Sequence, residues 1–359
     1  MDAQAKPAFS EQKLEAFMGR VIGDLAGAFS VGPVRIGDEL GLYAAMAGAG
    51  YLTAAEIAEK AGCAPRYVQE WLSHQVASGY VEYDPAAASF HLPPEHAFAL
   101  ADAESPAYIA RGFATAAALS ENKDVVAEAF RTGKGVPFKA QSGCLACSIA
   151  EFFRPGYRAN LIGAWLPAIE GIVEKLEVGA KVADIGCGHG HSTAIMAEAF
   201  PKSTFVGIDI DEASIMEARA HAGAHGGYDN LEFVVASAQE FEGAGFDFVT
   251  CFDALHDMGD PVGAARHIRE ALKPGGQWMI VEPFAHDGLE DNLSPINRMS
   301  YAASTMTCVP AALSQEGGMA LGAQAGQARL REVIVDHAGF SRLRRAAETP
   351  LNLILEATR

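Results

Sequence analysis

The sequence lacks an excess of positive charge and any long apolar run. Its 359 residues hold 27 Lys and Arg against 45 Asp and Glu, a formal net charge of −18. Nucleic acids and anionic membranes attract clustered Lys and Arg, so the composition makes both unlikely partners. No run reaches the roughly 18 to 20 apolar residues of a membrane span, and "MDAQAKPAFSEQK" has no apolar signal-peptide core. We therefore expect a cytoplasmic protein.

Cysteine is also scarce. The six cysteines are scattered along the chain, which favours reduced thiols. Cys144 and Cys147 form a CxxC pair, but no second pair or histidine cluster follows at zinc spacing. The sequence therefore predicts no metal site.

The length allows two or more compact domains. We expect a helical and winged-helix domain over residues 1–100, a helical connecting and substrate-pocket segment over 101–175, and a ligand-binding domain over 176–359. Residues 12–50 combine helical apolar spacing with few charges. Such helices are usually buried, here against a partner subunit, so we predict a homodimer through the N-terminal helices.

Residues 53–92 have the outline of a winged helix. Thr53 can cap one helix, Pro65 can open a second, and "YVEYD" and "SFHL" alternate like two short strands. Residues 51–100 contain only two basic residues against six acidic ones. Dimerisation and covering of a substrate pocket are therefore favoured over DNA binding.

After residue 180 the pattern changes to strands that alternate with helices. Short apolar runs predict the strands: "KVADI", "TFVGI", "LEFVV", "FDFVTCF", "QWMIVEP" and the late "NLILEAT". This alternation is typical of an α/β fold with a doubly wound, mostly parallel sheet. Ligands of such sheets bind beyond the carboxyl ends of the strands.

The loop "DIGCGHG" follows the first of these strands. Its glycines let the backbone approach a ligand closely, but Asp184 would repel the pyrophosphate of a dinucleotide. A ligand with an ammonium or sulfonium group removes this conflict. S-adenosylmethionine has both, and Asp209, 25 residues later at the next strand end, can accept its ribose hydroxyls. The predicted cofactor is S-adenosylmethionine, with these binding residues: Asp184, Gly186, Gly188, Gly190, Asp209, Ile210, Ser237, Ala238, Phe252 and Asp253.

The segment "FDALHDMGDP" places His256 at the end of the fourth strand, and "MIVEPF" places Glu282 at the end of the fifth. An imidazole with an ordinary pKa of about 6.5 is suited to accept a hydroxyl proton. We predict His256 as a general base, supported by Glu282 and Asp257. Thiolates and many amines need no base, so S-, N- or C-methylation by positioning and desolvation is an alternative. A regulator that binds S-adenosylmethionine without turnover is a second one.

Together these motifs resemble the class I adenosylmethionine-dependent methyltransferases. More narrowly, "RYVQEWLSHQVASGYVEYD", "DIGCGHGHS", "FDALHDMGDP" and "TPLNLILEAT" are similar to a bacterial winged-helix methyltransferase family, found in mycobacteria among others. The resemblance covers about residues 20–357. Its architecture is also that of small-molecule O-methyltransferases, which implies a seven-stranded sheet and a small-molecule methyl acceptor.

In those O-methyltransferases an H-D-W segment carries the base. His256 occupies that position here, while Met258 departs from the third residue of the segment. A second orienting Glu is expected later in the chain, where this sequence has Gln324 and Gln327. The resemblance also places segments beside the acceptor that supply the predicted substrate residues Tyr157, Tyr301 and Met306.

Overall fold

The computed structural model describes residues 9–143, 145–224 and 226–359. Its contacts divide the chain into two compact units. The first is Met1–Ala103 with Tyr108–Ala117, and the second is Glu104–Ala107 with Ala118–Arg359. Residues 118–175, most of the predicted connecting segment, belong to the same compact unit as the sheet. None of the helices in the described parts combines the length and apolarity of a membrane span.

The first unit begins with the 29-residue helix α1 (Glu11–Glu39), which Ser10 caps by accepting from Lys13 N. The following elements are α2 (Leu42–Met46), α3 (Ala54–Ala61), α4 (Pro65–Ala77), β1 (Glu82–Asp84), β2 (Ser89–His91), α5 (Pro94–Leu100) and the start of α6 (Ala110–Glu121). Thr53 and Glu56 form a capping box at α3, and Pro65 is the first residue of α4. Strands β1 and β2 pair antiparallel, so the predicted winged-helix outline is present.

The core of this unit joins the C-terminal part of α1 to the winged helix. Trp71 donates from Nε1 to the carbonyl of Pro33 at 2.8 Å, and Tyr43 donates its hydroxyl to Gln75 Oε1 at 2.8 Å. The N-terminal part of α1 differs, because its apolar side chains are exposed within the chain. These exposed residues are Leu14, Phe17, Met18, Val21, Ile22, Leu25 and Phe29.

The second unit is built around a seven-stranded sheet in the order β5-β4-β3-β6-β7-β9-β8. Its strands are β3 (Lys181–Ile185), β4 (Thr204–Asp209), β5 (Leu231–Val235), β6 (Phe246–Phe252), β7 (Leu272–Pro283), β8 (Arg342–Glu348) and β9 (Asn352–Thr358). The first five are parallel, and β9 runs antiparallel to both β7 and β8. The predicted fold class is thereby confirmed, with one edge strand, β8, that the apolar runs had not indicated.

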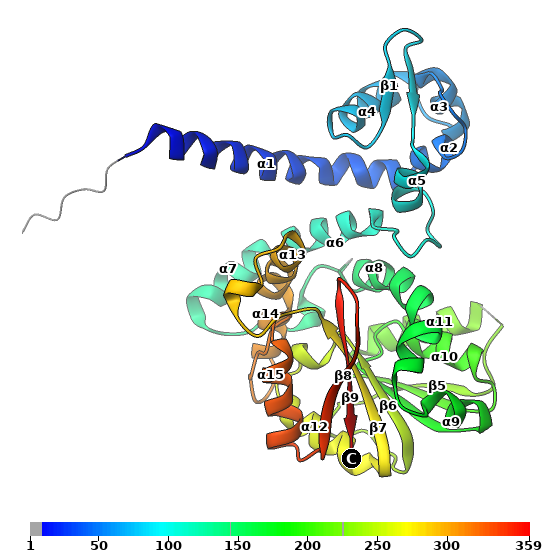
Figure 1. The fold of residues 1–359 in the computed structure, drawn as a ribbon, viewed down its shortest axis with the longest axis vertical. Helices are drawn as coiled ribbons and strands as arrows, with labels where there is room; N and C mark the ends of the chain where they lie inside the picture. The colour runs from blue at the N-terminus through cyan, green and yellow to red at the C-terminus, as the bar shows by residue number, and fades with distance from the viewer. Residues whose placement is uncertain (1–8, 144, 225) are drawn as a thin grey trace, which may run out of the picture. The chain divides into compact units, whose positions relative to one another are not determined.

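Helices cover both faces of the sheet (Figure 1). The elements before the sheet are α7 (Lys123–Thr132), η1 (Phe138–Ala140), α8 (Leu145–Asn160), η2 (Leu161–Trp165), η3 (Leu166–Ala168) and α9 (Ile172–Val178). The crossovers are α10 (His191–Ala199), α11 (Glu212–Ala224), and η4 (Leu255–Asp257) with α12 (Pro261–Ala271). The elements after β7 are η5 (Leu289–Asp291), α13 (Pro295–Ala303), η6 (Ser304–Cys308), α14 (Val309–Leu313), α15 (Gly326–Arg331) and η7 (Glu332–His337).

Two apolar layers hold this arrangement together. Alternate residues of β7 face opposite sides: Trp278 and Ile280 pack with α12 and η7, whereas Met279 and Val281 pack with α9 and α10. Burial on both faces explains why the central strands read as continuous apolar runs. Because β4 and β6 lie on opposite sides of β3, the strand order reverses there, and the carboxyl ends of β3 and β6 form the topological switch point.

Candidate active site

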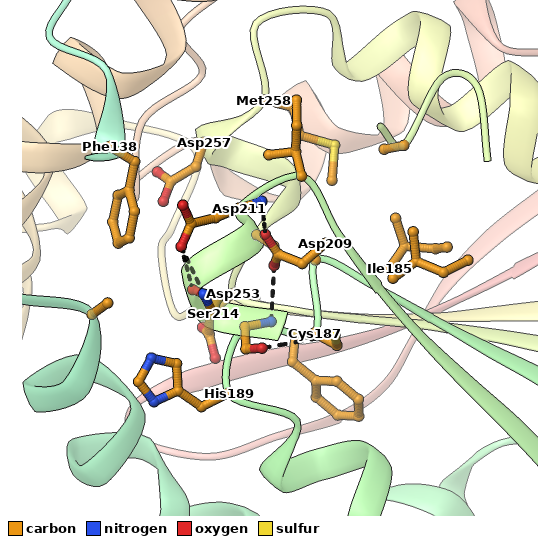
Figure 2. A pocket seen from close by; sticks show the side chains of 18 of the residues that line it. Phe138, Ile185, Cys187, His189, Asp209, Asp211, Ser214, Asp253, Asp257 and Met258 are labelled. Atoms are coloured by element: carbon orange, nitrogen blue, oxygen red, sulfur yellow. Dashed lines mark hydrogen bonds between the residues drawn. The ribbon is translucent and has the colours of Figure 1, made fainter. Parts of the chain in front are cut away.

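A cavity of about 250 Å³ lies at this switch point, inside the second unit. The loops after β3, β4, β5 and β6 line one part of it, and residues of η1, α8 and α14 line another. Figure 2 shows the carboxylates of Asp209, Asp211 and Asp257 around this space. Asp253 is a fourth lining acid, and the described lining residues include no Lys or Arg. The electrostatics of the cavity therefore favour a cationic ligand.

The glycine loop after β3 is shaped for close approach. Gly186 and Gly190 have φ of 72°, and a Cβ there would lie 2.6 Å from Ala254 Cβ and 2.4 Å from Phe233 Cζ, respectively. Packing and backbone conformation therefore both require glycine at these two positions. A Cβ at Gly188 would meet no atom within 4 Å, and Gly188 lines the cavity. Gly188 is thus the position where a ligand can approach the backbone.

Asp184 lies beneath this loop and is fully buried. Its Oδ2 accepts from the hydroxyls of Ser192 at 2.8 Å and Thr193 at 2.6 Å, and its Oδ1 accepts from Thr250 at 2.9 Å. Burial raises the pKa of this carboxyl, while the three hydroxyls oppose the shift. Asp184 does not line the cavity. The structure therefore gives it a different place from the predicted ligand contact: it ties the start of α10 and strand β6 to β3.

Asp209 lies at the end of β4 and does line the cavity. Its Oδ2 accepts from Gly188 N and its Oδ1 from Asp211 N, both at 2.9 Å (Figure 2). Each oxygen keeps a further lone pair that can accept a ribose hydroxyl. Burial raises the pKa of this carboxyl. Ile210, the next residue, lines the cavity and is 67% exposed.

The ends of the next two strands complete the predicted cofactor side. Ser237 and Ala238 follow β5, and Phe252 and Asp253 lie at the end of β6; all four line the cavity. The Ser237 hydroxyl donates to Gln239 Oε1, and Gln239 also lines the cavity.

Asp253 has an unusual backbone conformation for an aspartate, with φ of 50°. Its carboxylate accepts from the Tyr157 hydroxyl at 3.0 Å and from Asn352 Nδ2 at 3.2 Å. Burial, with the nearby charge of Glu282, raises the pKa of Asp253 to about 7. Such left-handed residues persist where the surroundings enforce them, often at functional sites. Tyr157 therefore lines the cavity and also positions this acid, while its contact with a substrate stays a prediction.

The predicted catalytic residues form a chain that leads to the cavity. His256 Nδ1 lies 2.5 Å from Glu282 Oε2, and Glu282 Oε1 accepts from Leu255 N at 3.0 Å. On the other side, His256 Nε2 lies 3.2 Å from Asp257 Oδ1. His256 is 3% exposed and does not line the cavity, whereas the Asp257 side chain is 30% exposed and does. The structure thus brings all three together, with Asp257 rather than His256 at the cavity.

This arrangement changes the chemistry expected of the imidazole. Burial alone would lower the pKa of His256, but the carboxylates of Asp257 and Glu282 outweigh it and raise that pKa well above its usual value. A histidine already protonated between two carboxylates cannot accept a further proton. The side chain of this cluster that lines the cavity is therefore that of Asp257, with His256 behind it.

Other sequence-predicted residues lie elsewhere. Tyr301 on α13 and Met306 in η6 are partly buried, and neither lines the cavity. Gln324 bonds to Asn297 and to the carbonyl of Phe284, so it does not orient His256. Gln327 accepts from Arg345.

Sequence reasoning missed several cavity residues. Among them are Phe138, Ala146, Ile149, Ala150, Phe153, His189, His191, Asp211, Ala311 and Gln315. The helical spacing of Ala146, Ile149, Ala150 and Phe153 on α8 was the available signal. Which side of the helix meets the cavity depends on tertiary packing.

Comparisons with known proteins agree with this geometry. Residues 176–332 match the family model described as a methyltransferase domain, and residues 29–102 match an Rv2258c-like winged HTH domain. The ubiquinone biosynthesis O-methyltransferase of Idiomarina loihiensis is 34% identical over 126 residues, 35% of this chain and 50% of that protein. The trans-aconitate 2-methyltransferase of Deinococcus radiodurans is 34% identical over 108 residues, 30% of this chain and 40% of that protein. The chain thus spans half or less of the length of these relatives.

Solved structures resemble the whole chain in fold. Human N-acetylserotonin methyltransferase, in complex with SAM, has a TM-score of 0.68 at 16% identity and covers 99% of both chains. The mitomycin 7-O-methyltransferase has a TM-score of 0.67 at 19% identity, covering 98% of this chain and 100% of that one. The protein therefore has the class I methyltransferase fold. Within that class, its methyltransferase domain is joined to an Rv2258c-like winged helix, which confirms the resemblance inferred from the sequence.

Proposed function

We propose that this protein transfers the methyl group of S-adenosylmethionine to a small-molecule acceptor, at an oxygen atom. The observation that carries the proposal is the acid-lined cavity at the switch point, which holds four aspartates and no described Lys or Arg. Such a lining disfavours a pyrophosphate and suits a cofactor with ammonium and sulfonium groups. The open position at Gly188 and the free lone pairs of Asp209 fit the ribose side of that cofactor.

The acceptor side supports a small, largely apolar substrate. Phe138, Ile149 and Phe153 line the cavity, and their side chains exclude water from the reacting atoms. When bound, S-adenosylmethionine supplies an electrophilic methyl group. Asp257 meets the acceptor hydroxyl and takes its proton, while His256 and Glu282 stabilise the changing charge.

The same proposal covers the assembly. The exposed apolar stripe of α1, defined above by seven residues from Leu14 to Phe29, suits a second copy of the chain. A winged helix that bound DNA would need a basic surface, but Arg66 of α4 pairs with Glu70 at 2.6 Å. The regulator alternative is therefore not favoured. A cytoplasmic location stays a prediction from the sequence.

A methyl-donor turnover screen tests this function. It would present phenols, alcohols, thiols, amines and carboxylic acids with S-adenosylmethionine and identify the methylated atom. For an oxygen acceptor, Asp257→Asn should lower kcat by about 10²- to 10⁴-fold with unchanged cofactor affinity. Turnover confined to thiols or amines, and unaffected by Asp257→Asn, would instead indicate S- or N-methylation that works by positioning of the acceptor alone. No turnover of any class would remove oxygen methylation as the function.

A further inference from the structure

We propose that His256, Asp257 and Cys308 form a binding site for a divalent transition-metal ion, and that Zn²⁺ is the ion their chemistry fits. One ligand atom from each residue, the imidazole nitrogen, a carboxylate oxygen and the thiol sulfur, lies within 4.8 Å of the other two. The residues come from η4 and from the end of η6, 51 positions apart. The sequence predicted no metal site because its cysteines lack the short spacing of zinc ligands. Ligands that lie far apart in the sequence do not show such a spacing.

The first supporting observation is the distance between two of the ligand atoms. His256 Nε2 and Asp257 Oδ1 are 3.2 Å apart. Two ligands of a tetrahedral ion, each about 2.0 to 2.1 Å from it, are separated by about 3.3 Å. This pair therefore already has the spacing of one edge of a zinc tetrahedron.

A second, independent observation is a buried oxygen without a hydrogen bond. Although the Asp257 side chain as a whole is partly exposed, its Oδ1 is buried. Among the described residues, no donor reaches it with hydrogen-bond geometry. Its ion-pair contact with His256 Nε2 at 3.2 Å lacks hydrogen-bond geometry, and a coordinated cation would satisfy this buried oxygen.

The third observation is the contact on the far side of the imidazole. His256 Nδ1 lies 2.5 Å from Glu282 Oε2. Histidines that bind metals usually donate their other ring nitrogen to a carboxylate, which fixes the tautomer and the ring orientation. Glu282 therefore holds His256 so that Nε2 is the nitrogen directed toward Asp257 and Cys308.

The ligand set also determines the ion and its open position. Mixed nitrogen, oxygen and sulfur donors in a tetrahedral arrangement favour Zn²⁺ over Mg²⁺ or Ca²⁺. Binding would release the Cys308 thiol proton and any proton on His256 Nε2 to solvent, leaving two anionic ligands and one neutral ligand. Three protein ligands leave a fourth position, and Asp257 and Met258 line the adjacent cavity.

The role of the ion rests on the proposed function, although its binding does not. An ion at the open edge of this cavity would bind the acceptor oxygen or sulfur and favour its ionised form. It would place positive charge at the position that a protonated His256 holds in the metal-free protein. The acceptor class then extends to groups that coordinate zinc, such as phenols and thiols.

Cobalt titration of the chelator-treated, reduced full-length protein tests the site, because Co²⁺ replaces Zn²⁺ and is coloured. We expect one equivalent to give a sulfur-to-cobalt charge-transfer band that Zn²⁺ abolishes. Cys308→Ser should remove the band, while Cys63→Ser, a thiol in the winged-helix unit, should keep it. Glu282→Gln should weaken Co²⁺ binding about 10- to 100-fold. Thermal unfolding of each variant verifies that it is folded.

Two results would overturn the site: no band in the wild-type protein at one equivalent, or a band that survives in folded Cys308→Ser. A band lost equally in Cys63→Ser would also overturn it, because the metal would then lie on other thiols. None of these readouts needs a methyl donor or an acceptor. Failure of the metal site is therefore distinguishable from failure of methyl transfer, which calorimetry with S-adenosylmethionine measures separately.

Discussion

Replacing Asp184 separates two roles for the acid of the glycine loop. The sequence suggests direct contact with a cationic cofactor, whereas the structure shows a buried carboxylate that accepts three hydroxyl hydrogen bonds. Asp184→Asn keeps the shape and one oxygen acceptor but removes the charge. Asp184→Ala removes the acceptors altogether. The two variants therefore test charge and hydrogen bonding in turn.

The expected loss of stability follows from the three bonds. In Asp184→Ala, the hydroxyls of Ser192, Thr193 and Thr250 lose their acceptor in a fully buried place. Each bond contributes about 0.5 to 1.5 kcal/mol, and each unsatisfied group costs about 1 to 3 kcal/mol. We expect Asp184→Ala to lose about 3 to 5 kcal/mol of unfolding free energy and Asp184→Asn about 1 to 2 kcal/mol. Urea denaturation measures both losses.

Cofactor affinity gives the sharper contrast. A direct charged hydrogen bond to the cofactor would contribute about 1.5 to 3 kcal/mol, so its loss would weaken binding about 10- to 150-fold. Because Asp184 does not line the cavity, we expect Asp184→Asn to change the Kd for S-adenosylmethionine by less than about threefold. Asp209→Asn, at a cavity-lining position, is the matched control and should weaken binding more. A tenfold loss in Asp184→Asn at nearly unchanged stability would refute this reasoning.

Three further predictions concern the loop, an acid and the assembly. Gly186→Ala should cost about 2 kcal/mol or more in urea denaturation, because φ is 72° and the new Cβ would lie 2.6 Å from Ala254 Cβ; an unchanged midpoint would contradict the packing. The pKa of Asp253 is raised to about 7 in the folded state, whereas the pKa of an unfolded aspartate is about 3.9. Between these two pH values the folded carboxyl is protonated and the unfolded one is not. It should therefore lower stability as the pH rises from about 4 to about 7, and Asp253→Asn should flatten that decline, measured by unfolding at pH 5 and pH 8; an equal slope in both proteins would count against the shift. Ile22→Glu with Leu25→Glu should turn a dimer into a monomer in sedimentation velocity, and a monomeric wild-type protein would refute the proposed role of the stripe.

The sheet was largely predictable, for a physical reason. Central parallel strands are buried on both faces, so they form apolar runs that a sequence displays directly. Strand β8 was not predicted because it lies at the sheet edge and consists only of exposed and partly buried positions. Its Arg342, Arg344 and Arg345 conceal it from a search for apolar runs, although the resemblance implied seven strands.

The position of the site was predictable, but the directions in which its side chains point were not. Strand-end placement correctly brought Asp209, His256 and Glu282 to one edge of the sheet. It could not show that Asp184 turns inward, because that depends on hydroxyls from two other elements meeting it in the folded chain. Nor could it show that Asp257 meets the cavity in place of His256. Side-chain direction in a tight turn after a strand is set by packing, which no spacing in the sequence encodes.

The most direct test of the central claim is calorimetric titration of the cavity with S-adenosylmethionine and with its demethylated product, S-adenosylhomocysteine. Both ligands are expected to bind at one site per chain, and Asp209→Asn should weaken the binding of both. If neither ligand binds to the folded wild-type protein, the proposed cofactor and the methyl transfer that depends on it are contradicted.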